Sequence, residues 1–197
     1  MNYIIVFFIA TFGLYKFFTE KEIHRPPGVL VKESPVQKEL PVTAKPILYK
    51  NQILQPLADY KIKGRLLSAE KYWLDATADI SPIDLCLGWN HLSDSTYLED
   101  LTISQNSRFC FYRYNSEFSL NPEEIKVSIS NTHIIPANAV IKKQVDRLRI
   151  GQVVELSGQL VRVDQRNGQE WMSSLTRDDE GPGACEIMYV TNIRILL

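Results

Sequence analysis

The chain has 197 residues, of which 45% are hydrophobic and 23% charged, and its formal net charge at pH 7 is −1. A chain so close to neutral lacks the strongly basic surface that a firm electrostatic grip on nucleic acid requires. Three cysteines are too few for a disulfide-rich scaffold, so the length and composition favour one domain with a hydrophobic core of its own.

The N-terminus is apolar from residue 3 to residue 18, with Lys16 as its only charged side chain. At about 1.5 Å per residue this stretch spans roughly 24 Å as a helix, which is short for a hydrocarbon core of about 30 Å. Aromatic residues at its end can lie in the interface, and Lys16 can reach the headgroups. We therefore predict a transmembrane anchor over residues 1–18.

Two alternatives to the anchor stay open. A cleaved signal peptide would need a basic start and small residues before the cut, and neither is present. A buried core helix would normally show a polar face, which this stretch lacks. The prediction is a single-pass membrane protein.

The side of the membrane on which the body lies is left open by the sequence. Lys16, Lys21, Arg25 and Lys32 follow or end the apolar stretch, which favours a cytoplasmic body under the positive-inside rule. An anchor that begins at residue 2 is also typical of exported bodies.

Residues 19–52 are predicted to form an extended linker. Prolines at positions 26, 27, 35, 41 and 46 rule out a long helix there, and interleaved Lys and Glu favour solvated backbone. Residues 28–31 are apolar enough to dock on the body.

Residues 53–197 are predicted to form a β-rich globular domain. In chain order we expect a strand over 59–68, a short helix from Pro82 to Gly88, a short helix over 94–101, strands over 107–114 and 125–130, and a helix from Pro136 that ends at Gly151. A long alternating strand over 152–164 follows, with Gly158 as a bend, and Asn167-Gly168 turns it into a partner strand over 170–175. Strands over 185–190 and 193–196 end the chain.

This pattern predicts a β-rich α+β fold. A bent strand, a hairpin and a late strand suit a small OB-like or SH3-like barrel with two or three short helices.

Several short sequence segments of the chain also resemble those of a protein family. They are Pro-Gly-Val-Leu-Val (27–31), Asp-Ile-Ser-Pro-Ile-Asp-Leu (79–85), Leu-Gly-Trp (87–89), Ser93-Asp94, Ile-Ser-Gln-Asn-Ser-Arg (103–108), His-Ile-Ile-Pro-Ala (133–137), Ser-Ser-Leu-Thr-Arg (173–177) and Gly-Ala-Cys-Glu (183–186). Together they resemble a family of uncharacterised, often membrane-anchored bacterial proteins. The resemblance brings no reaction with it. Residues 90–92, Asn-His-Leu, depart from the smaller residues that the family pattern implies at that loop.

No catalytic motif stands out, so candidate residues come from their positions at strand ends. We predict a functional face made of Trp89, Ser93, Asp94, Arg108, His133, Arg177 and Asp178. His133 is the strongest candidate for chemistry, with Ser173 or Ser174 as a nucleophile and Asp178 as an orienting group. The competing interpretation of His133 is a side chain that only bonds nearby backbone.

The cysteines and histidines do not form a metal motif. Cys86, Cys110 and Cys185 lack Cys-x-x-Cys spacing, and the three histidines are far apart in sequence. We expect no metal and no cofactor, and interpret the cysteines as small buried hydrophobes. One disulfide with a free thiol is the alternative if the body is exported, and the sequence does not select the pair.

The leading functional hypothesis is a membrane-tethered, non-enzymatic module that binds a protein partner. The first alternative is a membrane-bound hydrolase that uses His133 with Ser173 or Ser174. The second is a binder of single-stranded nucleic acid or oligosaccharide on an OB-like face, with nucleic acid disfavoured by the near-zero net charge.

Overall fold

The computed structural model describes residues 21–165, 168–177, 179, 181 and 183–197. No helix in these ranges is long and apolar enough to cross a bilayer. The expected anchor over residues 1–18 lies outside the described residues.

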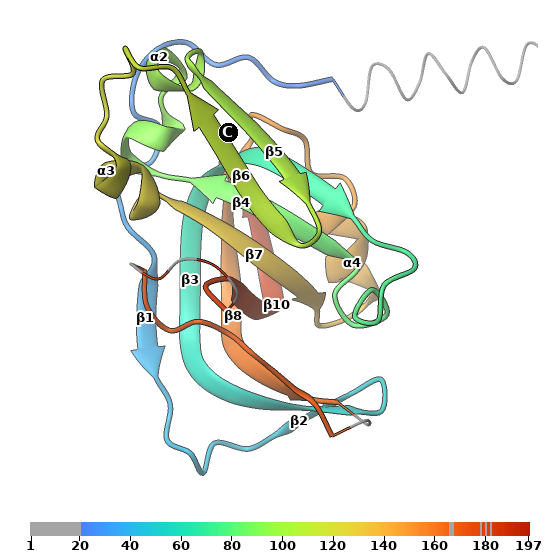
Figure 1. Cartoon of the computed structure of the whole chain (residues 1–197). Coiled ribbons are helices and arrows are strands. Elements are labelled where there is room, and N and C mark those ends of the chain that lie inside the picture. The colour runs from blue at the N-terminus through green and yellow to red at the C-terminus, as the bar shows by residue number, and fades with distance from the viewer. Residues whose placement is uncertain (1–20, 166–167, 178, 180, 182) are drawn as a thin grey trace, which may run out of the picture.

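The described chain is a β-rich α+β fold whose ten strands form two sheets (Figure 1). The strands are β1 (Val36–Glu39), β2 (Ile47–Tyr49), β3 (Gln52–Lys71), β4 (Ile83–Gly88), β5 (Leu101–Asn106), β6 (Phe109–Tyr114), β7 (Ile129–Pro136), β8 (Val153–Asp164), β9 (Glu170–Met172) and β10 (Glu186–Ile195). The short helices are a 3-10 turn at Asn90–Ser93, α2 (Ser95–Leu98), α3 (Pro122–Lys126) and α4 (Ala139–Val145).

Five strands of the larger sheet pair in a closed cycle. The order β3-β4-β7-β10-β8 returns to its start because β8 also pairs with β3, over Ile53–Asp164 to Arg65–Val153. The long strand β3 bends, and in this way it pairs with both β4 and β8 (Figure 1). Side chains that point into this cycle build the main core, which includes Tyr60, Leu85, Leu156 and Met188.

The hairpin β5–β6 forms the second sheet and lies over β4 and β7 (Figure 1). A disulfide between Cys86 of β4 and Cys110 of β6 joins the two sheets, with Cα atoms 6.0 Å apart. Cys185 is the free cysteine and is partly exposed. The interpretation of all three cysteines as buried hydrophobes is therefore wrong, and one disulfide with one free thiol is present.

The segment before β3 lies against the body. The Ser93 hydroxyl accepts hydrogen bonds from the backbone N–H groups of Leu30 and Val31, and Asp94 accepts one from Gly28 at 2.8 Å. Val31 is buried in the main core. Strands β1 and β2 both pair with β3, so much of the expected linker adds to the fold.

Two of the expected elements are wrong. Residues 83–88 form strand β4 and not a helix, because this run is buried on both faces between β3 and β7 and shows no alternation. Residues 125–126 form the end of helix α3 and not the start of a strand. The helix begins at Pro122 because Asn121 and Glu124 form a reciprocal capping box around this residue.

The strand over 152–164 is confirmed as β8, and β9 pairs with it antiparallel as the expected hairpin. Asn167 of the expected turn lies outside the described residues. Gly158 lets β10 approach closely, because a Cβ there would lie 1.9 Å from the carbonyl oxygen of Tyr189. The pairing of β10 with β8 shifts register directly beyond this point.

This close contact gives a stability prediction. Gly158→Ala should lower the free energy of unfolding by about 2 kcal/mol or more, because the backbone of β10 must move to admit the methyl group. Urea denaturation measures the change. The matched control is Ser157→Ala on the neighbouring residue, which should stay within about 0.5 kcal/mol of the wild type. Equal stability of the two variants would contradict the tight β8–β10 contact.

Candidate active site

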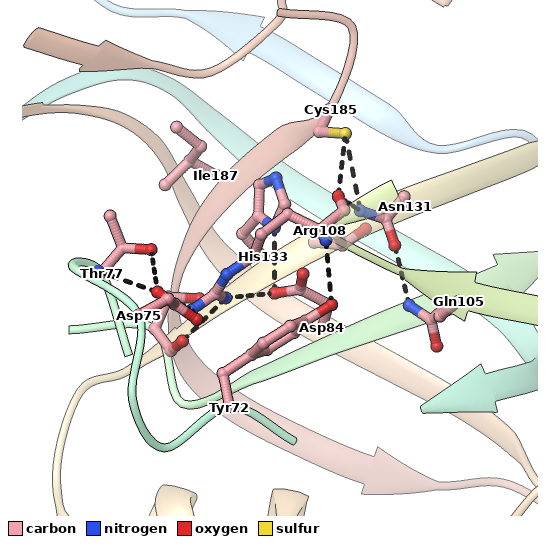
Figure 2. A network of polar contacts seen from close by, with 12 residues as sticks. Tyr72, Asp75, Thr77, Asp84, Gln105, Arg108, Asn131, His133, Cys185 and Ile187 are labelled. Atoms are coloured by element: carbon pink, nitrogen blue, oxygen red, sulfur yellow. Dashed lines mark hydrogen bonds and ion pairs between the residues drawn. The ribbon is translucent and has the colours of Figure 1, made fainter. Parts of the chain in front are cut away.

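Three neighbouring strands place Asp84, His133 and Cys185 on one face. The antiparallel pairing of β4 with β7 sets Asp84 opposite His133, and the parallel pairing of β7 with β10 sets Ile187 opposite His133. Residues two apart on a strand share a face, so Cys185 lies diagonally across from His133. Figure 2 shows the His133 ring between Asp84 and Cys185.

The imidazole of His133 lies against a carboxylate, and the thiol of Cys185 acts on it electrostatically. Its Nδ1 lies 2.9 Å from Oδ1 of Asp84, and the two side chains are 4% and 0% exposed. The separation is that of an ion pair, although the ring N–H is not aimed along the line between the two atoms. The thiol of Cys185 is the second polar partner of the ring. Trp171 covers the ring, with centroids 4.9 Å apart.

These contacts decide the charge of the ring. Burial alone would lower the pKa of His133, but the hydrogen-bonding and charge interactions with Asp84 and Cys185 outweigh it and raise the pKa to about 9. His133 is therefore an imidazolium at neutral pH. A neighbouring imidazolium stabilises a thiolate, which is the reactive form of cysteine.

Cys185 is open to solvent on its other side. It lines a pocket of about 330 Å³ whose walls include Phe109, Phe111, Asn131 and Arg177. The amide nitrogen of Asn131 lies 3.5 Å from the sulfur, and the carbonyl oxygen of Arg108 lies 3.8 Å from it. The sulfur thus has a donor, an acceptor and a charged ring beside it, with a cavity in front.

Arg108 holds the carboxylate end of this group. It occupies the second position of the two-residue turn between β5 and β6, where Ser107 and Arg108 both have positive φ. Its Nη1 donates to Oδ1 of Asp84 at 2.9 Å, and its Nη2 donates to both carboxylate oxygens of Asp75 at 2.8 Å. The guanidinium also lies 3.7 Å from the ring centroid of Tyr72.

A second buried acid lies beside the thiol. Glu186 follows Cys185 directly, is 3% exposed and pairs with Arg177 and with the hydroxyl of Ser130. Arg177 also donates to the Tyr60 hydroxyl at 3.1 Å. Arg177, an expected site residue, therefore lines the same pocket as Cys185. Its link to this region is the pairing with Glu186 and not a direct contact with His133.

The two serines considered as nucleophiles have other partners. The Ser173 hydroxyl donates to the Ser174 carbonyl oxygen and accepts from the Ile187 N–H. The Ser174 hydroxyl donates to Asp179 at 2.6 Å. Within the described part of the chain, neither serine hydroxyl is hydrogen-bonded to His133.

The remaining expected residues divide between two places. Arg108 belongs to the Asp84 group, whereas Trp89, Ser93 and Asp94 lie beyond the opposite end of β4. Five residues of strand, about 17 Å, separate Asp84 from Trp89. Trp89 is buried, and Ser93 and Asp94 hold the segment around Gly28–Val31. Asp178 lies outside the described residues.

Sequence reasoning missed Asp84 and Cys185. The incorrect helix over 82–88 hid the register that sets Asp84 opposite His133. The signal that could have found Cys185 was its place directly before a strand and after the Gly-rich loop at 181–184, which is an accessible position and not a core position.

No cluster of three or more metal-ligating side chains occurs within the described ranges. Comparison with protein-family models, with curated proteins and with solved structures found no match. The argument for function therefore depends on the geometry of this site.

The raised pKa of His133 predicts a pH-dependent stability. Because the folded pKa of about 9 exceeds the ordinary 6.5, the contribution is complete below pH 6.5 and is lost as pH rises through 9. Its size is roughly 3 kcal/mol. Urea denaturation of the wild type should show falling stability across this window.

The control for this prediction is His133→Gln, which removes the titrating group. The difference in unfolding free energy between wild type and variant should shrink by most of that amount between pH 6.5 and pH 9.5. A difference that does not change with pH would show that His133 is not charged in the folded protein.

Proposed function

We propose that this chain is a membrane-tethered thiol enzyme that hydrolyses or transfers acyl groups through Cys185. One observation carries the proposal: the buried imidazole of His133 lies 2.9 Å from the buried carboxylate of Asp84, and it interacts electrostatically with a thiol that lines an open pocket. A nucleophile, a base and an orienting acid in this order are the parts that covalent catalysis requires.

The chemistry follows from these positions. The Cys185 thiolate attacks the carbonyl carbon of an ester or amide, and a C–S bond forms. The His133 imidazolium gives its proton to the leaving alcohol or amine as the C–O or C–N bond breaks. Neutral His133 then takes a proton from water or from an acceptor nucleophile, which attacks the thioester and releases the thiolate. Asp84 keeps the ring oriented and favours its charged form.

The fold supports a binding site at this position. We infer an OB-like barrel from the closed five-strand order, the parallel pairing of β7 with β10, and the placement of α4 between β7 and β8. Barrels of this type bind ligands on the face of their middle strands and in the adjoining loops. Asp84 lies on β4, His133 lies on β7, and Cys185 directly precedes β10.

The disulfide supports a body on the oxidising side of the membrane. Disulfides persist in the bacterial periplasm and outside the cell and are rare in the cytosol. With the apolar stretch over residues 3–18 as an anchor, the proposed location is the outer side of a bacterial inner membrane. The positive charges after the anchor favour the opposite side, and the disulfide is the observation on which this proposal rests.

A non-enzymatic binding module is the second candidate. Aromatic residues of β6, namely Phe109, Phe111 and Tyr112, form one wall of the pocket, and such walls stack on sugars or bases. In this alternative Cys185 is an ordinary thiol and the pocket binds an oligosaccharide, a single strand or a protein segment.

Two covalent probes test the enzyme proposal. Iodoacetamide should label Cys185 at pH 7, and His133→Gln should lower the labelling rate about tenfold because the thiolate loses its charged partner. Cys185→Ser should abolish labelling. Mass spectrometry of the intact protein measures the rates.

A fluorophosphonate probe serves as the control for the serine alternative. Labelling of Ser173 or Ser174 by this probe would replace the thiol mechanism with the hydrolase first considered. Labelling of Cys185 at the same rate in wild type and His133→Gln would refute the activated thiol and favour the binding module.

The proposed location has its own test. Differential alkylation of the chain in intact cells should find one free thiol, at Cys185, and find Cys86 and Cys110 protected until a reductant is added. Three free thiols in the untreated sample would place the body on the reducing side.

A further inference from the structure

The connection between β3 and β4 carries two exposed apolar side chains at its tip. Trp73 is 77% exposed and Leu74 is 99% exposed. Single exposed apolar residues are ordinary, but an adjacent Trp and Leu at the end of a loop form a compact apolar tip. Their backbone is held by neighbours, since Tyr72 and Asp75 both bind Arg108.

Basic side chains surround this tip. Lys50, Lys71 and Lys142 line a hollow of about 230 Å³ together with Trp73, Asp79 and Asp146, and the Lys142 ammonium pairs with the Asp146 carboxylate at 2.7 Å. The Lys71 ammonium donates to the carbonyl oxygen of Asp146, which ties the loop to the end of α4. Lys143 and Arg147 are exposed on the same segment and add two further cations.

The same segment also meets the first described residues of the chain. Arg149 donates two hydrogen bonds to the carbonyl oxygen of Lys21, and the Ile23 N–H donates to Ile150 at 2.8 Å. In Figure 1, α4 and the β3–β4 loop lie at the right of the body, and the described chain begins near its top. The apolar stretch over residues 3–18 directly precedes this point in the sequence.

We propose that this basic apolar face, made of Trp73, Leu74, Lys50, Lys71 and Lys142, binds the anionic lipid surface of the membrane that anchors the chain. Trp is enriched at the headgroup level, and a Leu beside it can enter the acyl boundary. Lys side chains near an anionic surface are attracted to it and strengthen the binding. The proposal rests on the anchor of the proposed function and adds a second contact with the same bilayer.

This contact would orient the candidate active site. Trp73 lies between Tyr72 and Asp75, the two residues that fix Arg108, and Arg108 in turn binds Asp84. A loop fixed on the lipid surface therefore holds the Asp84–His133–Cys185 group close to the headgroups. The substrate class that fits is an acyl group carried by a molecule of that bilayer, presented from the membrane side.

Fluorescence quenching by lipid tests the proposal on the full chain. The chain is reconstituted in nanodiscs of brominated phosphatidylcholine with phosphatidylglycerol, and emission is compared with discs of unbrominated lipid. Wild type should lose part of its emission in brominated discs, and Trp73→Phe should abolish that loss. Trp171→Phe is the matched control and should keep it, because Trp171 packs on His133.

Charge is tested separately with the double variant Lys71→Glu, Lys142→Glu. The quenching should fall in this variant, in discs without phosphatidylglycerol, and at high salt. Trp73 emission that is unaffected by brominated lipid overturns the proposal and leaves the tip as a contact for a protein partner. Quenching that is equal with and without phosphatidylglycerol overturns the choice of an anionic surface.

The same experiment tests the anchor independently of the lipid contact at Trp73. A chain that stays out of the nanodiscs refutes the anchor of the proposed function. Quenching of Trp73 by added brominated vesicles then still decides whether this face binds lipid.

Discussion

The buried carboxylate of Asp84 is the group on which the site depends. It is fully buried, and a charge in that position is tolerated only when partners compensate it. Both partners share Oδ1: Arg108 at 2.9 Å and His133 at 2.9 Å. Oδ2 has no hydrogen-bond partner within the described residues. Removing Asp84 would leave the buried His133 ring without its counter-charge, whereas Arg108 would keep its pairing with Asp75.

The shared carboxylate joins parts of the chain that are distant in sequence. Arg108 brings in the turn of the β5–β6 hairpin, and Asp75 and Tyr72 bring in the β3–β4 connection. The disulfide between Cys86 and Cys110 fixes the same hairpin to β4 two residues from Asp84. The β5–β6 hairpin beside the pocket, the Asp84 carboxylate and the Cys185 thiol are therefore held in fixed positions relative to one another. Acyl transfer requires such fixed positions.

The buried charged side chains form two groups beside one pocket. Asp84 keeps His133 charged, and the paired Glu186 and Arg177 neutralise each other beside it. The thiol of Cys185 lies between these two groups and remains open to the pocket. This arrangement leaves the imidazolium as the charge that acts directly on the sulfur.

Part of this account could be read from the sequence. Alternation over 152–164 predicts β8, and its Gly158 marks the close approach of β10, because these signals are local. The expected face includes His133 and Arg108, and the structure places both beside Asp84. Asp84 and Cys185 were missed because their significance depends on register across three strands. That register depends on β4, whose doubly buried run lacks the period that distinguishes a strand from a helix.

The functional account makes one central claim, that His133 is an imidazolium held between a carboxylate and a thiol. Nitrogen-15 chemical shifts of the His133 ring at pH 7.5 test it most directly. The account predicts that both ring nitrogens are protonated in the wild type, since the pKa lies near 9, and that Asp84→Asn moves the ring towards the neutral form at the same pH. A neutral ring in the wild type at pH 7.5 would contradict the claim, and with it the activated thiol of Cys185.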